Sequence, residues 1–301
     1  MFEDIKNILN LFNEKVHNQY GFEAKDFFRI GQRKKKAEVI VVCNQKGGCG
    51  KTTTAINLSA FLAKRGNKVL LIDLDTQAHA SLGIGVDVNN LKWTIFDVLI
   101  HNEDFNKVIT QTSVENLFIA PANHLLSGAQ LQLANFVARE SILKSHLNKF
   151  LLTRHFDYCI IDTSPTLNLI TLNGLVAANQ VLIPIQTHYF ALEGMKELFF
   201  TIDVVKERLN PELKIMGILP TLFDHRIEAN RIMLSELNEY FGDIMLKTVI
   251  HYTSSLIEAP RYKKPVVSYA PNSMGAFYYL TLTDELEQIM VKKEERGEEI
   301  Q

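Results

Sequence analysis

The chain has 301 residues, of which 47% are hydrophobic, so it is long enough to form one large domain with a substantial core. Its formal net charge of −2 at pH 7 excludes a generally basic nucleic-acid-binding protein but allows a local basic patch. No apolar run is long enough to span a bilayer, and Cys43, Cys49 and Cys159 have the spacing of neither a zinc site nor a disulfide framework. With an acidic rather than a secretory N-terminus, these features predict a protein of the reducing cytoplasm.

The first 36 residues differ in pattern from the rest, and we expect them to form a separate helical extension. Apolar residues recur there at helical spacing and predict an amphipathic helix that ends near Gly21. A shorter segment then leads into a basic linker at residues 31–36. Two interpretations stay open: a helix that packs on the main domain, or an element that binds DNA, a partner or a second copy. We favour the first, because the stretch is too short for a helix-turn-helix domain.

Residues 39–65 combine a strand, a glycine-rich loop and a helix in that order. The apolar run 39–43 predicts a buried strand, and apolar spacing predicts a helix over residues 52–65. The loop between them reads K-G-G-C-G-K-T-T and comprises Lys46, Gly47, Gly48, Cys49, Gly50, Lys51, Thr52 and Thr53. Because glycines let backbone N–H groups turn inward and the helix N-terminus adds a positive field, this order predicts a phosphate-binding loop. Lys51 would reach the terminal phosphates, and the Thr52 hydroxyl would serve as a ligand of Mg²⁺.

Two further predicted strands end in carboxylates. The apolar run 69–73 ends in D-L-D, which places Asp73 and Asp75 two residues apart. A second run, 158–162, ends at Asp162 and is followed by T-S-P. Because the carboxyl ends of parallel strands meet at one edge of a sheet, these carboxylates would lie near the phosphate-binding loop. We expect Asp162 to hold Mg²⁺ through water, as in a Walker B element.

The rest of the pattern continues to alternate strands with helices. Strands rich in Ile, Val and Leu are predicted over residues 117–120, 181–185, 214–219 and 246–250. Helices are predicted over residues 129–152, 170–178, 192–209, 227–240 and 274–293. Repeated strand–helix units predict an α/β fold: a doubly wound, mostly parallel sheet with helices on both faces and its ligand at the carboxyl ends of the strands.

One departure from the ordinary phosphate-loop pattern points to a family. The pattern G-x-x-x-x-G-K-[ST] requires glycine where this chain has Gln45, and a second lysine, Lys46, heads the loop instead. This form resembles the deviant Walker A motif of the ParA/MinD family of P-loop ATPases. The segments D-L-D-T-Q and D-T-S-P are similar to its switch segments, and V-L-I-P-I-Q and A-L-E-G resemble its Soj-like ParA branch. The likeness covers roughly residues 38–290, so we expect a P-loop ATPase domain over residues 37–301.

The resemblance implies an ATPase of weak intrinsic activity that uses Mg²⁺ and closes as a homodimer around two ATP molecules. Lys46 of each subunit would contact the nucleotide of the other, where a cation offsets charge on the transferring phosphoryl group. Asp75 would orient the attacking water, and Asp73 would support the Mg²⁺ shell or Lys51. The segment that begins at Pro220 and ends at Asp224 would line the adenine.

The same resemblance implies partners. Partition ATPases of this branch bind DNA without sequence preference, and a ParB-like protein stimulates their hydrolysis. We therefore expect a cytoplasmic, nucleoid-associated ATPase that positions a plasmid, a chromosome or another cargo. DNA contact would involve phosphates and would weaken with salt. The basic candidates in the C-terminal half are Lys206, Arg208, Arg226, Arg231, Arg261, Lys263 and Lys264.

Other relatives of the same fold suit the sequence less well. A MinD-like, membrane-cycling ATPase should end in an amphipathic helix, whereas residues 292–301 are rich in acidic side chains, so we expect no membrane partner. An iron–sulfur reductase needs cysteines after the switch segments, where this chain has none. Two alternatives stay open: a positioning or regulatory ATPase that acts mainly on a protein, and a hydrolysis-poor module in which nucleotide stabilises a dimer.

Overall fold

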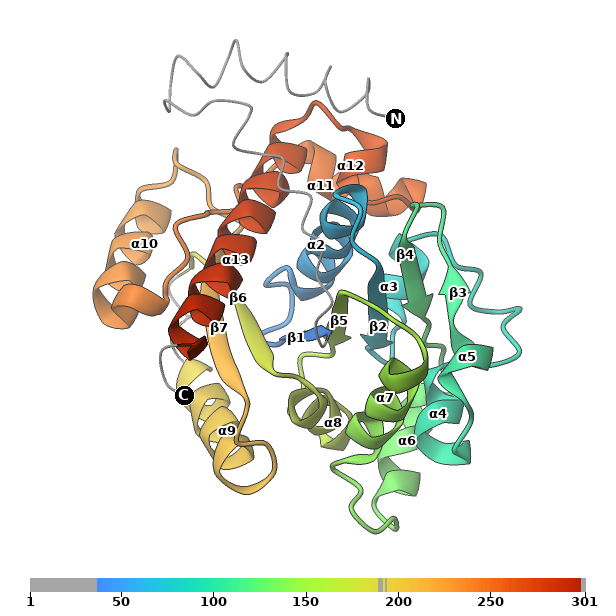
Figure 1. Cartoon of the computed structure of the whole chain (residues 1–301). Coiled ribbons are helices and arrows are strands. Elements are labelled where there is room, and N and C mark those ends of the chain that lie inside the picture. Colours follow the sequence, from blue (N-terminus) through green and yellow to red (C-terminus); the bar gives the residue numbers. More distant parts are fainter. Residues whose placement is uncertain (1–36, 189–191, 193, 299–301) are drawn as a thin grey trace.

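The computed structural model describes residues 37–188, 192 and 194–298 (Figure 1). The expected extension, residues 1–36, therefore lies outside the described residues. The strands are β1 (Glu38–Val42), β2 (Val69–Leu74), β3 (Thr110–Gln111), β4 (Leu117–Ala120), β5 (Tyr158–Thr163), β6 (Gln180–Gln186) and β7 (Lys214–Thr221). They form one sheet in the order β3-β4-β2-β5-β1-β6-β7, in which β3 is antiparallel to β4 and the other pairs are parallel. The prediction of a mostly parallel sheet is confirmed.

Helices cover both faces of this sheet. The α-helices are α2 (Lys51–Lys64), α3 (His79–Gly83), α4 (Ile95–His101), α5 (Phe105–Val108), α6 (Leu126–Leu133), α7 (Ile142–Thr153), α8 (Leu169–Ala177), α9 (Met195–Arg208), α10 (Glu228–Phe241), α11 (Ser254–Glu258), α12 (Val266–Tyr269) and α13 (Met274–Glu298). Two short 3-10 helices, η3 (Gly242–Ile244) and η4 (Ala259–Tyr262), join α10 and α11 to the segments that follow them. None of the helices in the described ranges is both long and apolar enough to cross a membrane.

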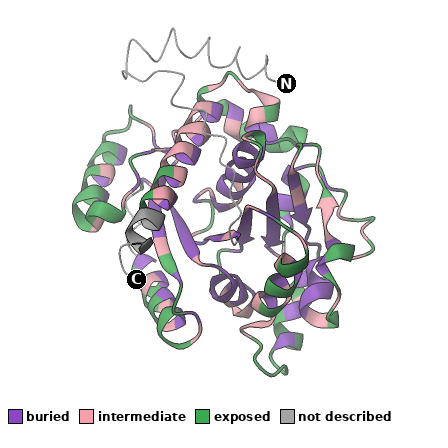
Figure 2. Cartoon of the chain, in the orientation of Figure 1, coloured by how far each residue is buried: buried purple, intermediate pink, exposed green. Residues whose placement is uncertain are grey.

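Each face of the sheet has its own hydrophobic core. In β1, Val39 and Val41 belong to the core that includes residues of α4, α6, α7, α8 and α9, whereas Ile40 and Val42 belong to the core with α2 and α13. The central strands and α2 are buried along most of their length, and exposed residues gather on the outer helices (Figure 2). Burial on both faces explains why these strands read as continuous apolar runs.

Two predicted elements are wrong. The single helix expected over residues 129–152 is divided into α6 and α7. Between them Ala138 adopts a left-handed conformation with φ 51°, and the carbonyl of Arg139 accepts a hydrogen bond from the Asn173 side chain of α8 instead of a helical partner. The strand expected over residues 246–250 does not form a ladder. Its Leu246 and Ile250 N–H groups, four residues apart, bond to carbonyls only two residues apart in β7, so the segment cannot run in register.

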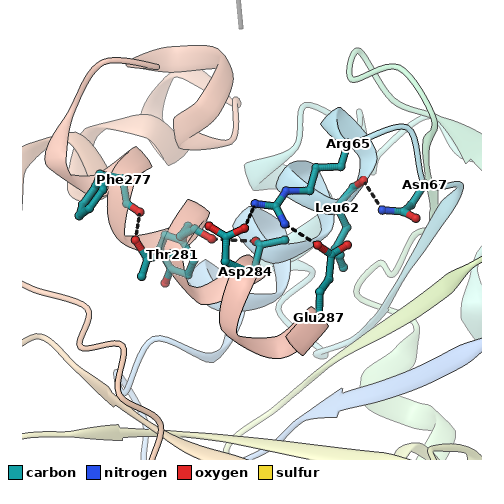
Figure 3. A network of polar contacts seen from close by, with 9 residues as sticks. Leu62, Arg65, Asn67, Phe277, Thr281, Asp284 and Glu287 are labelled. Atoms are coloured by element: carbon teal, nitrogen blue, oxygen red, sulfur yellow. Dashed lines mark hydrogen bonds and ion pairs between the residues drawn. The ribbon is translucent and has the colours of Figure 1, made fainter. Parts of the chain in front are cut away.

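Helix α13 crosses the outer face of α2, the helix that begins at the glycine-rich loop (Figure 1). The Thr54 and Tyr279 hydroxyls lie 3.2 Å apart in the buried contact between the two helices. At the other end of α2 the Arg65 guanidinium bonds to the carboxylates of Asp284 and Glu287 (Figure 3). Burial raises the pKa of Asp284, and the charge of Arg65 opposes that rise. The C-terminal helix thus fixes the position of α2 at both of its ends.

Replacing Arg65 with alanine should destabilise the fold, because Asp284 would stay largely buried without a counter-charge. We expect Arg65→Ala to lower the free energy of unfolding in urea by about 2–3 kcal/mol. The matched control is Lys64→Ala, since Lys64 is exposed in the same helical turn. Equal free energies of unfolding for the two variants would contradict this role of Arg65.

Candidate functional site

The glycine-rich loop joins the carboxyl end of β1 to the first turn of α2. Gly48 and Gly50 have φ angles of 74° and 86°, in the left-handed region that favours glycine. The Asn44 side chain accepts a hydrogen bond from the Lys46 N–H (3.0 Å) and donates one to the carbonyl of Pro184 in β6 (2.7 Å). The neighbouring strands β6 and β7 therefore hold this loop, because the Thr221 hydroxyl of β7 also donates to the carbonyl of Cys49 (2.9 Å).

The start of α2 is open toward the loop. Gly50 caps the helix without a side chain, and the first turn contains no acidic residue. The N–H groups of that turn have no acceptor inside the helix, so they present a partial positive charge to the loop. Lys51 is buried, and its ammonium donates to the carbonyl of Lys46 (2.9 Å). This combination of N–H groups and a lysine is one that binds phosphate.

Two buried carboxylates lie next to this loop. Asp73 and Asp162 are directly opposite in the register of β2 and β5, and both side chains are fully buried. Asp73 accepts hydrogen bonds from the N–H (2.8 Å) and hydroxyl (2.6 Å) of Ser81 and from the N–H of Asp75 (3.0 Å). Within the described residues, neither oxygen of Asp162 has a hydrogen-bond partner. An unpartnered buried carboxylate is costly, so the arrangement favours a cation at Asp162.

The pKa values of both groups follow from this burial. Burial raises the pKa of Asp73 to about 6, against the opposing hydrogen bonds of Ser81. Burial also raises the pKa of Asp162 well above its usual range, and the charge of Asp73 adds to the rise. The Thr52 hydroxyl and the positive charge of the Lys51 ammonium oppose this rise of the Asp162 pKa.

The oxygen donors at this edge fit Mg²⁺ bound together with a phosphate ligand. In the part of the chain that the structure describes, no group of three or more His, Cys, Asp and Glu side chains could enclose a metal ion. Mg²⁺ is commonly held by one or two protein oxygens, with water and substrate phosphates completing the octahedral shell. Thr52 and Asp162 supply such oxygens beside the phosphate-binding loop.

Asp75 lies in the turn between β2 and α3. It is 7% exposed, its Oδ1 accepts the N–H of Gln77 (3.0 Å), and its Oδ2 lies 3.7 Å from Nδ1 of His79. Ala78 turns the chain into α3 with a left-handed φ of 53°. The turn thus holds a third carboxylate at the same edge of the sheet as the loop.

Pro220 is buried inside β7 opposite Ile185, and its carbonyl accepts the N–H of Ile250 (2.8 Å). The segment after it lies at the edge of the sheet that carries the loop, because Thr221 bonds to the loop. There the Phe223 ring packs edge-on against His251 at 5.0 Å. The segment predicted to line an adenine is therefore beside the phosphate-binding loop.

The basic candidates do not form one group. Arg226 pairs with Asp224 (2.6 Å), and Arg231 donates to the carbonyl of His225 (2.6 Å). Lys206 and Arg208 belong to the last turn of α9, which runs from the carboxyl end of β6 to the amino end of β7 and so ends at the opposite edge of the sheet. The remaining candidates, Arg261, Lys263 and Lys264, lie in and just after η4 and are exposed.

Sequence reasoning missed the polar residues that position the site. Ser81 holds Asp73 from eight residues away, and no motif surrounds it. Asn44 and Thr221 hold the loop, and Thr163 donates to the carbonyl of Val42 (2.8 Å). The one usable signal was position, because Asn44, Thr163 and Thr221 each stand at the carboxyl end of a strand.

Comparisons with known proteins agree on one family. Residues 37–215 match a family model described as an AAA domain. The chain is 41% identical over 249 residues to the sporulation initiation inhibitor protein Soj of Bacillus subtilis, an alignment that covers 83% of this chain and 98% of Soj. It is 40% identical over 267 residues to the chromosome partitioning protein ParA of Myxococcus xanthus, which covers 89% of this chain and 92% of that ParA.

A solved structure gives the same answer for the fold. Cobyrinic acid a,c-diamide synthase from Mycobacterium smegmatis, solved with bound ADP and magnesium, superposes with a TM-score of 0.74 at 34% sequence identity. The superposition covers 84% of this chain and 95% of the synthase chain. Because Soj and ParA are matched over nearly their whole length, the chain belongs to the Soj-like ParA branch of the ParA/MinD family of P-loop ATPases.

Proposed function

We propose that this protein is a partition ATPase that dimerises on Mg²⁺-ATP, binds DNA in that state and releases it after hydrolysis stimulated by a ParB-like partner. The observation that carries the proposal is the buried carboxylate of Asp162, which has no hydrogen-bond partner among the described residues, beside Lys51 and the open start of α2. The name of the relative from Myxococcus xanthus, a chromosome partitioning protein, supports chromosome partitioning as the process. The proposal includes a P-loop ATPase domain over residues 37–301, a separate extension over residues 1–36 and a nucleoid-associated, cytoplasmic location.

Each residue of the loop then has a role in binding. Lys51, which donates to the Lys46 carbonyl in this structure, would exchange that acceptor for the terminal phosphates of ATP. Thr52 would contact Mg²⁺ directly and Asp162 would do so through water. When bound, Mg²⁺ offsets the charge that develops on the phosphate oxygens. The segment of Pro220 to Asp224 would contact the adenine.

Asp75 would orient the water that attacks the terminal phosphate. Its Oδ1 accepts a hydrogen bond from the Gln77 N–H, which fixes the orientation of the carboxylate. The Asp75 side chain is also almost fully buried, so few solvent molecules reach it. A carboxylate held in this way accepts a hydrogen bond from one water and draws proton density from it as the new bond to phosphorus forms. Asp73, bound to Ser81 and to the N–H of Asp75, would position this turn and the neighbouring Mg²⁺ shell.

Lys46 would act on the nucleotide of the partner subunit. Its backbone is held by Asn44, its side chain is half-buried, and its ammonium makes no ion pair with any described residue. The lysine is therefore available for a phosphate that arrives on another molecule. In the closed dimer, two such lysines would offset the charge on two nucleotides.

Removing the Lys51 ammonium should remove most of the affinity for nucleotide. A charge-assisted hydrogen bond to phosphate contributes about 2–3 kcal/mol, so Lys51→Ala should weaken ATP binding roughly 30- to 150-fold. A titration with a fluorescent ATP analogue measures this change, and Lys64→Ala, at the far end of the same helix, is the matched control. Unchanged affinity in Lys51→Ala would refute the proposed phosphate site.

Removing the Asp75 carboxylate should separate binding from hydrolysis. Asp75→Ala should bind ATP but turn it over about 10²- to 10⁴-fold more slowly, since the attacking water loses its acceptor. The variant should therefore accumulate as an ATP-bound dimer, which light scattering measures. Asp203→Ala, which removes an exposed carboxylate on α9, serves as control. An Asp75→Ala protein that stays monomeric with ATP would show that the role is wrong.

A further inference from the structure

An exposed turn of the chain carries three cations that have no carboxylate partner among the described residues. We call Arg261, Tyr262, Lys263 and Lys264 the basic turn; all four residues are exposed. Among the described residues, none of the three cations forms an ion pair with a carboxylate. The acidic residue just before the turn, Glu258, accepts a hydrogen bond from the Tyr269 hydroxyl at 2.7 Å. The Tyr269 ring in turn stacks on the Tyr262 ring, with 4.8 Å between the ring centroids. The exposed Tyr262 side chain therefore lies among the three cations of the turn.

The basic turn is held by the helix that starts at the phosphate-binding loop. The N–H of Val266, two residues after the turn, donates to Oδ1 of Asn57 in α2 (2.7 Å). The same Asn57 side chain donates to the carbonyl of Thr53 in the first turn of α2 (2.8 Å). A buried side chain thus connects the segment just after the basic turn to Thr53, the residue next to Thr52.

The basic turn also contacts the segment that follows Asp73 and Asp75. Its Lys263 has a left-handed φ of 55°. Gly85 lies directly against the turn, because a Cβ atom at this position would be only 3.2 Å from the Lys263 carbonyl oxygen. Gly85 stands just beyond α3, and α3 packs against η4. The turn therefore rests on the two segments that lead from the nucleotide site, one from the phosphate-binding loop and the other from Asp75.

The remaining basic candidates are less suited to bind phosphate. The Arg226 guanidinium already has a carboxylate partner, since it bonds to both oxygens of Asp224 and holds the pKa of that carboxyl far below its usual range. Arg231 uses a donor on a backbone carbonyl. Lys206 and Arg208 lie at the edge of the sheet away from the phosphate-binding loop. A cation that already has a carboxylate partner adds little binding free energy when it displaces counterions from DNA. The three cations of the basic turn would add more, because they have no such partner among the described residues.

We propose that the basic turn, rather than α9 or α10, contacts the phosphates of duplex DNA, and that its attachment to α2 and α3 makes this contact depend on the bound nucleotide. The inference rests on the proposed function, because it assigns the DNA contact of the same ATPase. A dimer would present two such turns, and the exposed Tyr262 ring would pack against the sugar edge without reading base sequence.

The test is a DNA-binding titration of the full chain with ATP, Mg²⁺ and duplexes of unrelated sequence at several salt concentrations. The triple replacement Arg261→Ala, Lys263→Ala and Lys264→Ala should weaken binding at least about tenfold near 0.1 M salt. It should also make the slope of log K against log[salt] shallower by about 0.9 for each phosphate that the variant no longer neutralises. The control removes the same charge elsewhere, by Lys149→Ala, Lys214→Ala and Lys247→Ala, at three exposed lysines outside the turn. It should keep most of the affinity and the full slope.

The possible results distinguish a failure of the basic-turn assignment from a failure of the proposed function. If the unmodified chain binds DNA with ATP and the turn variant binds equally well with the same slope, the basic turn does not bind the DNA and the proposed function stands. If the control falls as far as the turn variant, overall charge rather than this turn is responsible, and the assignment is again overturned. If the unmodified chain shows no ATP-dependent binding at all, the proposed function itself fails. The single variant Lys264→Ala gives a second readout, with an expected slope change of about 0.9.

Discussion

Two carboxylates are buried side by side at one edge of the sheet, and the need to compensate their charge constrains the rest of the site. Asp73 and Asp162 are opposite each other on adjacent parallel strands, where water cannot solvate either charge. Asp73 is compensated by hydrogen bonds from Ser81, but the described residues leave Asp162 with none. The nearby positive groups, Lys51 and the start of α2, belong to the loop that follows β1. The strand order places β1 next to β5, so the fold itself brings the phosphate-binding loop to the unpartnered carboxylate.

The groups that bind phosphate are held by contacts within the fold, whereas the groups proposed to act on other molecules are at least partly exposed. Asn44 and Thr221 tie the glycine-rich loop to β6 and β7, and α13 holds α2 through Tyr279 and Arg65. These contacts keep the phosphate-binding groups preorganised. The groups proposed to act between molecules, Lys46 and the basic turn, are instead partly or fully exposed and have no ion partners among the described residues. Asn57 and Gly85 connect the basic turn to α2 and to the segment that follows α3, the contacts through which we propose that bound nucleotide acts on the turn.

The sequence predicted the parts of this site that depend on local order. A strand, a glycine-rich loop and a helix in succession identify a phosphate site, and an aspartate after an apolar run identifies the end of a strand. Contacts between distant residues were not predictable in this way. No local pattern shows that Ser81 would bind Asp73, that Asn57 would hold Val266, or that Asn44 would bind the carbonyl of Pro184. The prediction of a single helix over residues 129–152 was wrong for the same reason. Between α6 and α7 the Arg139 carbonyl accepts a hydrogen bond from Asn173, which belongs to another helix.

The most direct test of the central claim is the Mg²⁺ dependence of ATP affinity, measured by calorimetric titration with Mg²⁺ and with a chelator. The account predicts that the unmodified chain binds ATP at least about tenfold more tightly with Mg²⁺, because the ion relieves the charge of Asp162. It also predicts that Asp162→Asn loses most of this difference while it binds metal-free ATP no more weakly. If Mg²⁺ changed the affinity of the unmodified chain not at all, or of Asp162→Asn by the same factor, the buried carboxylate would not be the metal-binding group and the account would be wrong.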